Sequence, residues 1–217
     1  MGIRIGTGLF GDVDNVNGHD IQTKFLVIGL PLVPLQSYFC TADGSGMEIP
    51  LSMRSVFFCY LRTAFFVVAI YGLLFGALDV FLDMHLIDTM SGPVMLGLGA
   101  ICAVLGVVSV LYLGTESKSR VLSRVAIGKL TGLYAHPDML PSDLRSRVAD
   151  DLQDSWQTMA EAVSVSDWRE LAESREVPAL AYCCALAVGT FETYESKNPD
   201  DRKVLQSIET QLRGQLE

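Results

Sequence analysis

Two long apolar segments, residues 63–82 and 93–114, constrain this chain more than any other feature of its sequence. The first segment contains a single ionisable side chain, Asp79, and the second contains none. As helices they would be about 30 and 33 Å long, which matches the hydrocarbon core of a bilayer. Because a protein of this size could hardly bury two helices that are apolar on every side, we expect transmembrane helices rather than core helices.

The basic residues predict how these two helices are oriented. Four Lys or Arg residues precede the first segment and four more lie within residues 118–129, whereas the connecting segment 83–92 has none. By the positive-inside rule, we expect a two-pass protein of a bacterial inner (cytoplasmic) membrane with both termini in the cytoplasm. The first 30 residues lack a basic start followed by an apolar run. The first apolar segment itself is therefore expected to direct insertion.

The overall composition argues against other classes of protein. The 25 Asp and Glu residues outnumber the 16 Lys and Arg residues, so the chain lacks the basic surface that a nucleic-acid partner requires. Half of the residues are hydrophobic, which is enough for a folded core and argues against disorder. The five cysteines form no C-x-x-C pair, and we expect reduced thiols rather than disulfides in this topology.

Residues 1–53 predict a small antiparallel β module on the cytoplasmic side. Short strand-like runs are separated by the turn-forming sequences DVDNVNG and ADGSG. The expected strands are residues 3–10, 21–29, 35–41 and 47–51. Pro31 and Pro34 lie between the second and third of these strands, where we expect a proline-stiffened corner rather than a tight turn.

The sequence TKFLVIGLPLVPLQSYF, residues 23–39, resembles a segment of small bacterial zinc-ribbon membrane-associated proteins. In that family a T-K-F/Y run leads into P-L-x-P-L, and a cysteine pair then binds zinc. The likeness covers 17 of the 217 residues, and Cys40 stands alone where the family has its pair. The resemblance therefore implies a β-hairpin without the metal site.

Residues 116–217 are rich in charge and predict a helical bundle. The expected helices are residues 117–134, 142–163, 167–174 and 178–194, followed by one that begins after Asn198. Ser166 is the expected cap of the short third helix. We therefore expect an α+β membrane protein with three parts, which are a β module (1–53), a transmembrane hairpin (54–115) and a cytoplasmic helical domain (116–217).

Residues 117–134 carry three basic side chains, Arg120, Arg124 and Lys129, next to an apolar stripe. One interpretation is an amphipathic helix on the membrane surface, whose basic side chains meet anionic lipid headgroups. The other interpretation is a straight continuation of the second transmembrane helix into the cytosol. The sequence favours neither.

Small residues at a spacing of four occur in both apolar segments. Gly72 and Gly76 form a G-x-x-x-G step in the first segment, and Cys102 and Gly106 form a second small face in the other. Such faces allow two helices to approach closely. Close approach between the two segments of one chain and self-association between protomers remain open.

The sequence contains few candidates for chemistry, and we expect no cofactor or metal and no enzymatic activity. Residues 6–11 satisfy G-x-G-x-x-G, but turn-forming residues follow instead of a helix, which argues against a dinucleotide site. His19 and His136 each lie near an Asp in the sequence, where turn and cap roles are expected. Asp79 is expected near the outer interface, too far from mid-membrane for a proton carrier.

These observations favour a non-catalytic accessory, scaffold or assembly subunit of a larger membrane complex. The expected partners are the lipid bilayer and the other subunits, which would dock on the acidic helical domain. From His136 onward, that domain has 8 basic and 16 acidic residues. The alternative is a homo-oligomeric membrane sensor or effector that acts through Gly72, Gly76 and Asp79.

Overall fold

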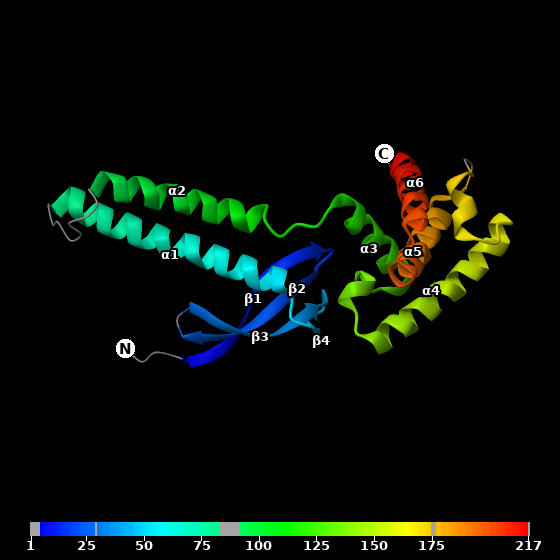
Figure 1. Ribbon diagram of the computed structural model, residues 1–217, viewed down its shortest axis with the longest axis horizontal. Helices are drawn as coiled ribbons and strands as arrows, with labels where there is room; N and C mark the ends of the chain where they lie inside the picture. The colour runs from blue at the N-terminus through cyan, green and yellow to red at the C-terminus, as the bar shows by residue number, and fades with distance from the viewer. Residues whose placement is uncertain (1–4, 29, 83–91, 175–176, 217) are drawn as a thin grey trace. The chain divides into compact units, whose positions relative to one another are not determined.

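The computed structural model describes residues 5–28, 30–82, 92–174 and 177–216, which form an α+β chain with its sheet first and its helices after it (Figure 1). Internal contacts divide the chain into two compact units. The first unit comprises residues 1–14, 20–40 and 46–115. The second comprises residues 15–19, 41–45 and 116–217. Most of the sheet therefore shares a unit with the two apolar helices. The sequence analysis expected the sheet and the helical hairpin to be two separate parts.

The sheet is antiparallel, and its strands follow one another in chain order. They are β1 (Ile5–Val16), β2 (His19–Ile28), β3 (Leu30–Cys40) and β4 (Gly46–Ile49). The sequence analysis assigned all of residues 12–18 to a turn, and this was wrong. The turn between β1 and β2 consists of Asn17 and Gly18 alone, whose φ angles of +52° and +80° suit a two-residue hairpin turn.

The end of β1 is a strand despite its turn-like composition because its side chains have partners. Val13 and Val16 are buried. Asp14 pairs with Arg54 at 2.8 Å, and Asp12 pairs with Arg62 at 3.2 Å. Both carboxylates, which would otherwise disfavour a strand, are held by arginines of the first apolar helix.

The two prolines lie inside β3 and not in a corner before it. Residues 28 and 30 face each other across the hairpin, and Pro31 and Pro34 are paired with Val27 and Phe25 of β2. The register shifts between Lys24 and Phe25 and again between Leu26 and Val27, so the ladder is irregular in this stretch. Such irregular positions tolerate residues that lack an N–H donor, which is why the expected corner was wrong.

The helices confirm the coarse expectation and change several boundaries. They are α1 (Met53–Leu82), α2 (Gly92–Leu111), α3 (Lys118–Thr131), α4 (Ser142–Val163), α5 (Ala179–Ser196) and α6 (Pro199–Leu216), with short 3-10 turns η1 (Pro137–Met139) and η2 (Trp168–Ala172). α1 begins ten residues before the predicted span, and its first turns pack on the sheet. The chain is not helical between Leu111 and Lys118, so α3 is no continuation of α2.

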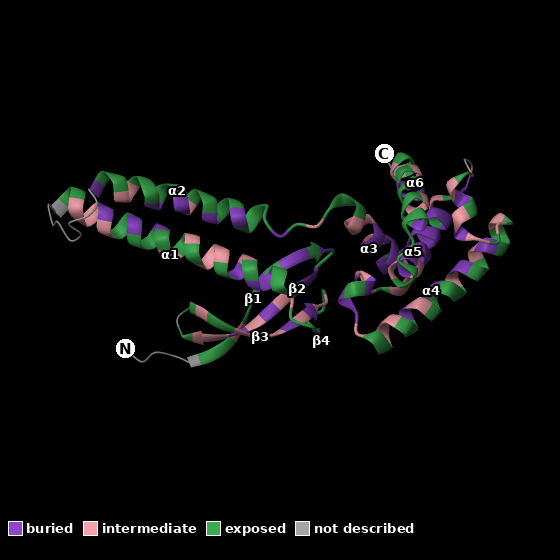
Figure 2. Cartoon of the chain, in the orientation of Figure 1, coloured by how far each residue is buried: buried purple, intermediate pink, exposed green. Residues whose placement is uncertain are grey.

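In the second unit α5 is the central helix of the bundle. Its residues from Ala181 to Phe191 are all buried, and Figure 2 shows α5 as largely buried. Burial raises the pKa of the Cys184 thiol to about 11. The side chains of Cys183 and Cys184 are both buried and pack in the core of the bundle. At η2 the expected cap was wrong by one residue, because the Asp167 carboxylate, not Ser166, accepts from the backbone N–H of Arg169.

Four hydrogen bonds, three of them buried, run in one direction through the first unit and join its sheet to α1. The backbone N–H of Ser52 donates to Ser37, which is linked to Thr23 by a hydroxyl–hydroxyl bond of 2.8 Å. Thr23 donates to Ser55 at 2.9 Å, and Ser55 donates to the carbonyl of Gly11 at 2.5 Å. Because the Thr23 proton goes to Ser55, Ser37 must be the donor to Thr23. Each hydroxyl therefore donates once and accepts once.

This relay of hydrogen bonds allows the effect of removing its last hydroxyl, that of Ser55, to be predicted. Ser55→Ala would remove the acceptor of the buried Thr23 hydroxyl and one donor to the Gly11 carbonyl, at a cost of about 1–3 kcal/mol. Hydrogen-exchange mass spectrometry should show faster exchange in β1 and β2, whereas Thr7→Ala, on an exposed residue of β1, should not. Equal protection in the two variants would contradict the role of the relay.

Candidate functional site

The closest approach of α1 and α2 is a seam of small residues, and it lies within one chain. An added Cβ atom on Gly72 would lie 2.8 Å from the Cα atom of Gly99, and one on Gly76 would lie 2.6 Å from the backbone nitrogen of Leu96. Real Cβ atoms do not approach other atoms this closely. Of the two possibilities that the sequence left open, the structure places the Gly72 and Gly76 face against α2 of the same chain.

Cys102 and Gly106 also lie on the α1 side of α2, but they are less tightly packed than Gly99. Cys102 is buried, and an added Cβ on Gly106 would lie 3.6 Å from the Phe65 side chain, an ordinary contact. Sequence reasoning missed Gly92 and Gly99. Their signal is a glycine every seven residues, at 92, 99 and 106, which places one small residue per two helical turns on one face.

Two charged side chains of α1 lie at the two ends of α2. At the first residue of α2, the Asp79 carboxylate accepts a 2.6 Å hydrogen bond from the backbone N–H of Gly92. At the other end, Arg62 donates to the carbonyls of Ser109 and Leu113 at 3.3 and 2.8 Å. An acid at a helix N-terminus and a base at a C-terminus both oppose the helix dipole, so each charge stabilises the end that it contacts.

The segment that follows α2 is hydrogen-bonded to the start of α1 and to β1. Besides its bonds to the α2 end, Arg62 contacts Asp12, and Arg54 donates to the carbonyl of Thr115 at 2.8 Å. The backbone N–H of Asp14 donates to the carbonyl of Gly114. The two arginines therefore serve as structural contacts between three segments that are distant in sequence.

The outer faces of α1 and α2 carry many exposed hydrophobic side chains, and Figure 2 shows exposed residues along both helices. Both helices are long and apolar enough to cross a membrane. Only 17% of the most apolar window of each is buried. Core helices of a soluble protein would have most of these side chains covered.

The seam predicts a sharp difference between two glycines of α2. Gly99→Ala places a methyl group in the backbone of α1 and should destabilise the helical hairpin by about 1–3 kcal/mol. Gly97→Ala meets no atom within 4 Å and should leave the hairpin unchanged or slightly stabilised. Unfolding by a denaturing detergent, followed by circular dichroism, measures both, and equal effects would argue against the seam.

The structure corrects the role of two of the three basic residues proposed for the membrane surface. The Arg124 side chain is fully buried, so it cannot meet lipid headgroups. Arg120 is partly buried and lies against the carboxylates of Glu116 and Asp138. Among the three, only Lys129 is exposed. Sequence spacing places these residues on one helix but does not reveal the carboxylates that neutralise them.

Arg124 connects three segments of the second unit. Its guanidinium donates to Glu116 at 2.7 Å, to the carbonyl of Tyr134 at 2.8 Å and to the carbonyl of His19 at 3.2 Å. The Glu116 side chain is itself only 2% exposed. Removing one partner of a buried ion pair of this kind leaves the other charge uncompensated, which costs several kcal/mol of stability.

Replacing Arg124 should therefore destabilise the helical bundle. Arg124→Met leaves Glu116 with Arg120 as its remaining cation, and we expect a loss of about 3 kcal/mol. Both tryptophans, Trp156 and Trp168, lie in the second unit, so their fluorescence during urea unfolding reports on it. Lys129→Met removes an exposed charge from the same helix and should change stability by less than about 0.5 kcal/mol. Similar losses in the two variants would contradict the buried role of Arg124.

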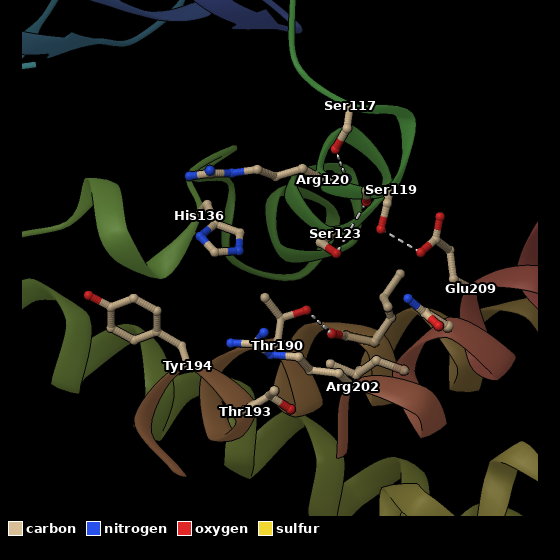
Figure 3. Close-up of a pocket in the computed structure, with 13 residues that line it drawn as sticks. Ser117, Ser119, Arg120, Ser123, His136, Thr190, Thr193, Tyr194, Arg202 and Glu209 are labelled. Carbon is tan, nitrogen blue, oxygen red and sulfur yellow. Dashed lines mark hydrogen bonds between the residues drawn. The ribbon is translucent and has the colours of Figure 1, made fainter. Parts of the chain in front are cut away.

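A pocket of about 330 Å³ lies within the second unit and is lined by residues of α3, α5 and α6 (Figure 3). Its hydroxyl-bearing residues are Ser117, Ser119, Ser123, Thr190, Thr193 and Tyr194. Three of these hydroxyls donate within the bundle, Ser119 to Glu209 at 2.6 Å, Thr190 to a carbonyl of α5 and Ser123 to a carbonyl of α3. The pocket offers a hydrogen-bonding surface for a small polar group.

His136 and Asp138 form a pair at the edge of this pocket. The Nδ1 atom of His136 lies 2.7 Å from Asp138, and Arg120 contacts the same carboxylate. Burial acts to raise the pKa of Asp138, but the hydrogen bond and charge of His136 and the charge of Arg120 outweigh it and hold that pKa at about 2. Among the described residues, no hydrogen bond joins the imidazole to a pocket hydroxyl.

Residues 6–11, the glycine-rich motif, do not line this pocket. Positions 6–11 belong to the single strand β1, without the following helix that a phosphate-binding turn needs. Over the described part of the chain, no group of three or more His, Cys, Asp or Glu side chains is placed to hold a metal ion.

Comparison of this chain with protein-family models, with curated proteins and with solved structures finds no match.

Proposed function

We propose that this protein is a two-pass membrane protein that holds its helical domain at the membrane surface as a non-catalytic accessory or scaffold subunit of a larger membrane complex. The observation that carries this proposal is the exposed apolar surface of α1 and α2. Both helices reach the length of a bilayer core, and only 17% of their most apolar windows are buried. Contact between this apolar surface and lipid chains has no hydrophobic cost, whereas its exposure to water is unfavourable in free energy.

The distribution of basic residues supports an orientation with both termini in the cytoplasm. Arg54 and Arg62 lie at the start of α1, beside the exit of α2, and no Lys or Arg lies in residues 83–92. The positive-inside rule then places the sheet and the helical domain on the cytoplasmic side of an inner membrane.

The outer face of α4 supports docking of a protein partner. Its exposed acidic residues are Asp143, Asp150, Asp151, Asp154 and Glu161. Arg147 is exposed on the same helix, while Arg145 is turned to the carbonyls of Pro137 and Leu140. A face of this charge suits a partner with a basic surface, because complementary charge speeds and orients association.

The alternative, a homo-oligomeric sensor or effector, is less favoured by these contacts. It needs the Gly72 and Gly76 face for pairing between protomers, but that face lies against α2. It also needs Asp79 in a pathway, and that carboxylate accepts from the N-terminus of α2.

Charge reversal on α4 tests the accessory role. The tagged protein is purified from native membranes in a gentle detergent, and its co-purifying subunits are quantified by mass spectrometry. Asp150→Lys with Asp154→Lys should release a stoichiometric partner, with at least a tenfold loss of recovery. Glu173→Lys with Glu195→Lys makes the same charge change on exposed residues outside α4 and should retain it. A homo-oligomer without any foreign subunit would contradict the accessory role.

A further inference from the structure

The end of the sheet where β2 meets β3 is apolar and carries no charge. From Phe25 to Ala42 the sequence has no Asp, Glu, Lys, Arg or His. The exposed side chains at this end are all large and hydrophobic, between 38% and 50% exposed, namely Ile28, Leu30, Leu32, Val33 and Leu35. Leu9 and Phe10 of β1 are also exposed. An uncharged group of this size is unusual on a surface that faces water.

This sheet end lies against α1 close to the arginine that contacts the end of α2. The Tyr60 hydroxyl donates to the carbonyl of Leu32 at 2.6 Å, and the Tyr60 ring packs edge-on against Phe25. Val27 packs on a buried cluster that includes Val56 and Cys59 of α1. Arg62, which contacts the end of α2, follows Tyr60 by only two residues, or about 3 Å along the helix. The apolar sheet end is thus continuous with the apolar surface of α1.

The backbone of β3 at this end exposes few unpaired hydrogen-bond donors. β4 covers the outer edge of β3 only at residues 37–40. In the uncovered part, Pro31 and Pro34 have no N–H group to satisfy. The Leu32 carbonyl there accepts from Tyr60. These features lower the cost of placing a strand edge next to lipid, where an unsatisfied backbone group is expensive.

We propose that this sheet end, residues 26–28 and 30–35, inserts into the interfacial layer of the bilayer beside α1. The inference rests on the membrane anchoring proposed above and adds a second contact with lipid. Lipid is the favoured occupant because the apolar sheet end adjoins the apolar helix surface through Tyr60 and lacks charge. Tyrosine itself is enriched at membrane interfaces, where its ring and hydroxyl meet apolar and polar surroundings.

Tryptophan quenching by brominated phosphatidylcholine in phosphatidylcholine–phosphatidylglycerol vesicles tests this proposal. Leu32→Trp, in the full-length reconstituted protein, should lose at least half of its added fluorescence when the lipid is brominated near the headgroup. Bromine placed deeper in the acyl chain should quench it less. Glu48→Trp, on the exposed side of β4, is the matched control and should not be quenched. Ile101→Trp, which is exposed near the middle of α2, reports on membrane anchoring itself.

The three variants separate the two proposals. Quenching of Ile101→Trp without quenching of Leu32→Trp would overturn insertion of the sheet end and leave the membrane anchor intact. If Ile101→Trp is not quenched, the membrane anchor is overturned and the inserted sheet end with it. A Leu32→Trp signal that resists both brominated lipid and aqueous acrylamide would mean that protein covers the sheet end, which also overturns the proposal. A far-ultraviolet circular dichroism spectrum unchanged from the parent confirms that each variant is folded.

Discussion

The pairing of α1 with α2 depends on two opposite charges on α1, placed at the two ends of its partner. Arg62 and Asp79 are separated by about 25 Å of helix, close to the length of α2. Because Asp79 contacts the N-terminus of α2 and Arg62 its C-terminal carbonyls, only an antiparallel arrangement satisfies both. Sliding either helix by one turn would uncouple both contacts, while the present register brings Gly72 against Gly99. The two charges therefore fix the register of α1 against α2, and the small residues fix how closely the two helices approach.

The same arginine extends this arrangement to the sheet. Arg62 contacts Asp12 of β1 as well as the exit from α2, and the relay from Ser52 to Gly11 joins three strands to the first turns of α1. A β module of this size has little core of its own. The buried hydroxyls and ion pairs explain how it is stabilised by α1, with which it shares one unit.

Hydropathy and turn chemistry were sufficient to predict the α+β order, both apolar helices and the bundle helices α4 to α6. They could not predict which charged side chains pair with one another. Arg120 and Arg124 have the spacing of a basic helix face, yet their neutralisation depends on Glu116 and Asp138. Strand β1 continues through an acidic run because Arg54 and Arg62 pair with it. Gly99, in contrast, had a visible signal, the glycine repeat of seven, which a search for G-x-x-x-G alone passes over.

The neutralised arginines bear on how the helical domain could stay at a membrane. An acidic domain is repelled by anionic headgroups unless basic side chains face them. In α3, Arg124 is buried and Arg120 lies between two carboxylates, which leaves Lys118 and Lys129 as its exposed cations. Two exposed lysines contribute about 1 kcal/mol each at an anionic surface. Adsorption of α3 would therefore be weak and sensitive to salt. In the membrane-anchored protein that we propose, retention of the domain would then depend on apolar contact with lipid, first by α1 and α2 and next by the uncharged sheet end beside Tyr60.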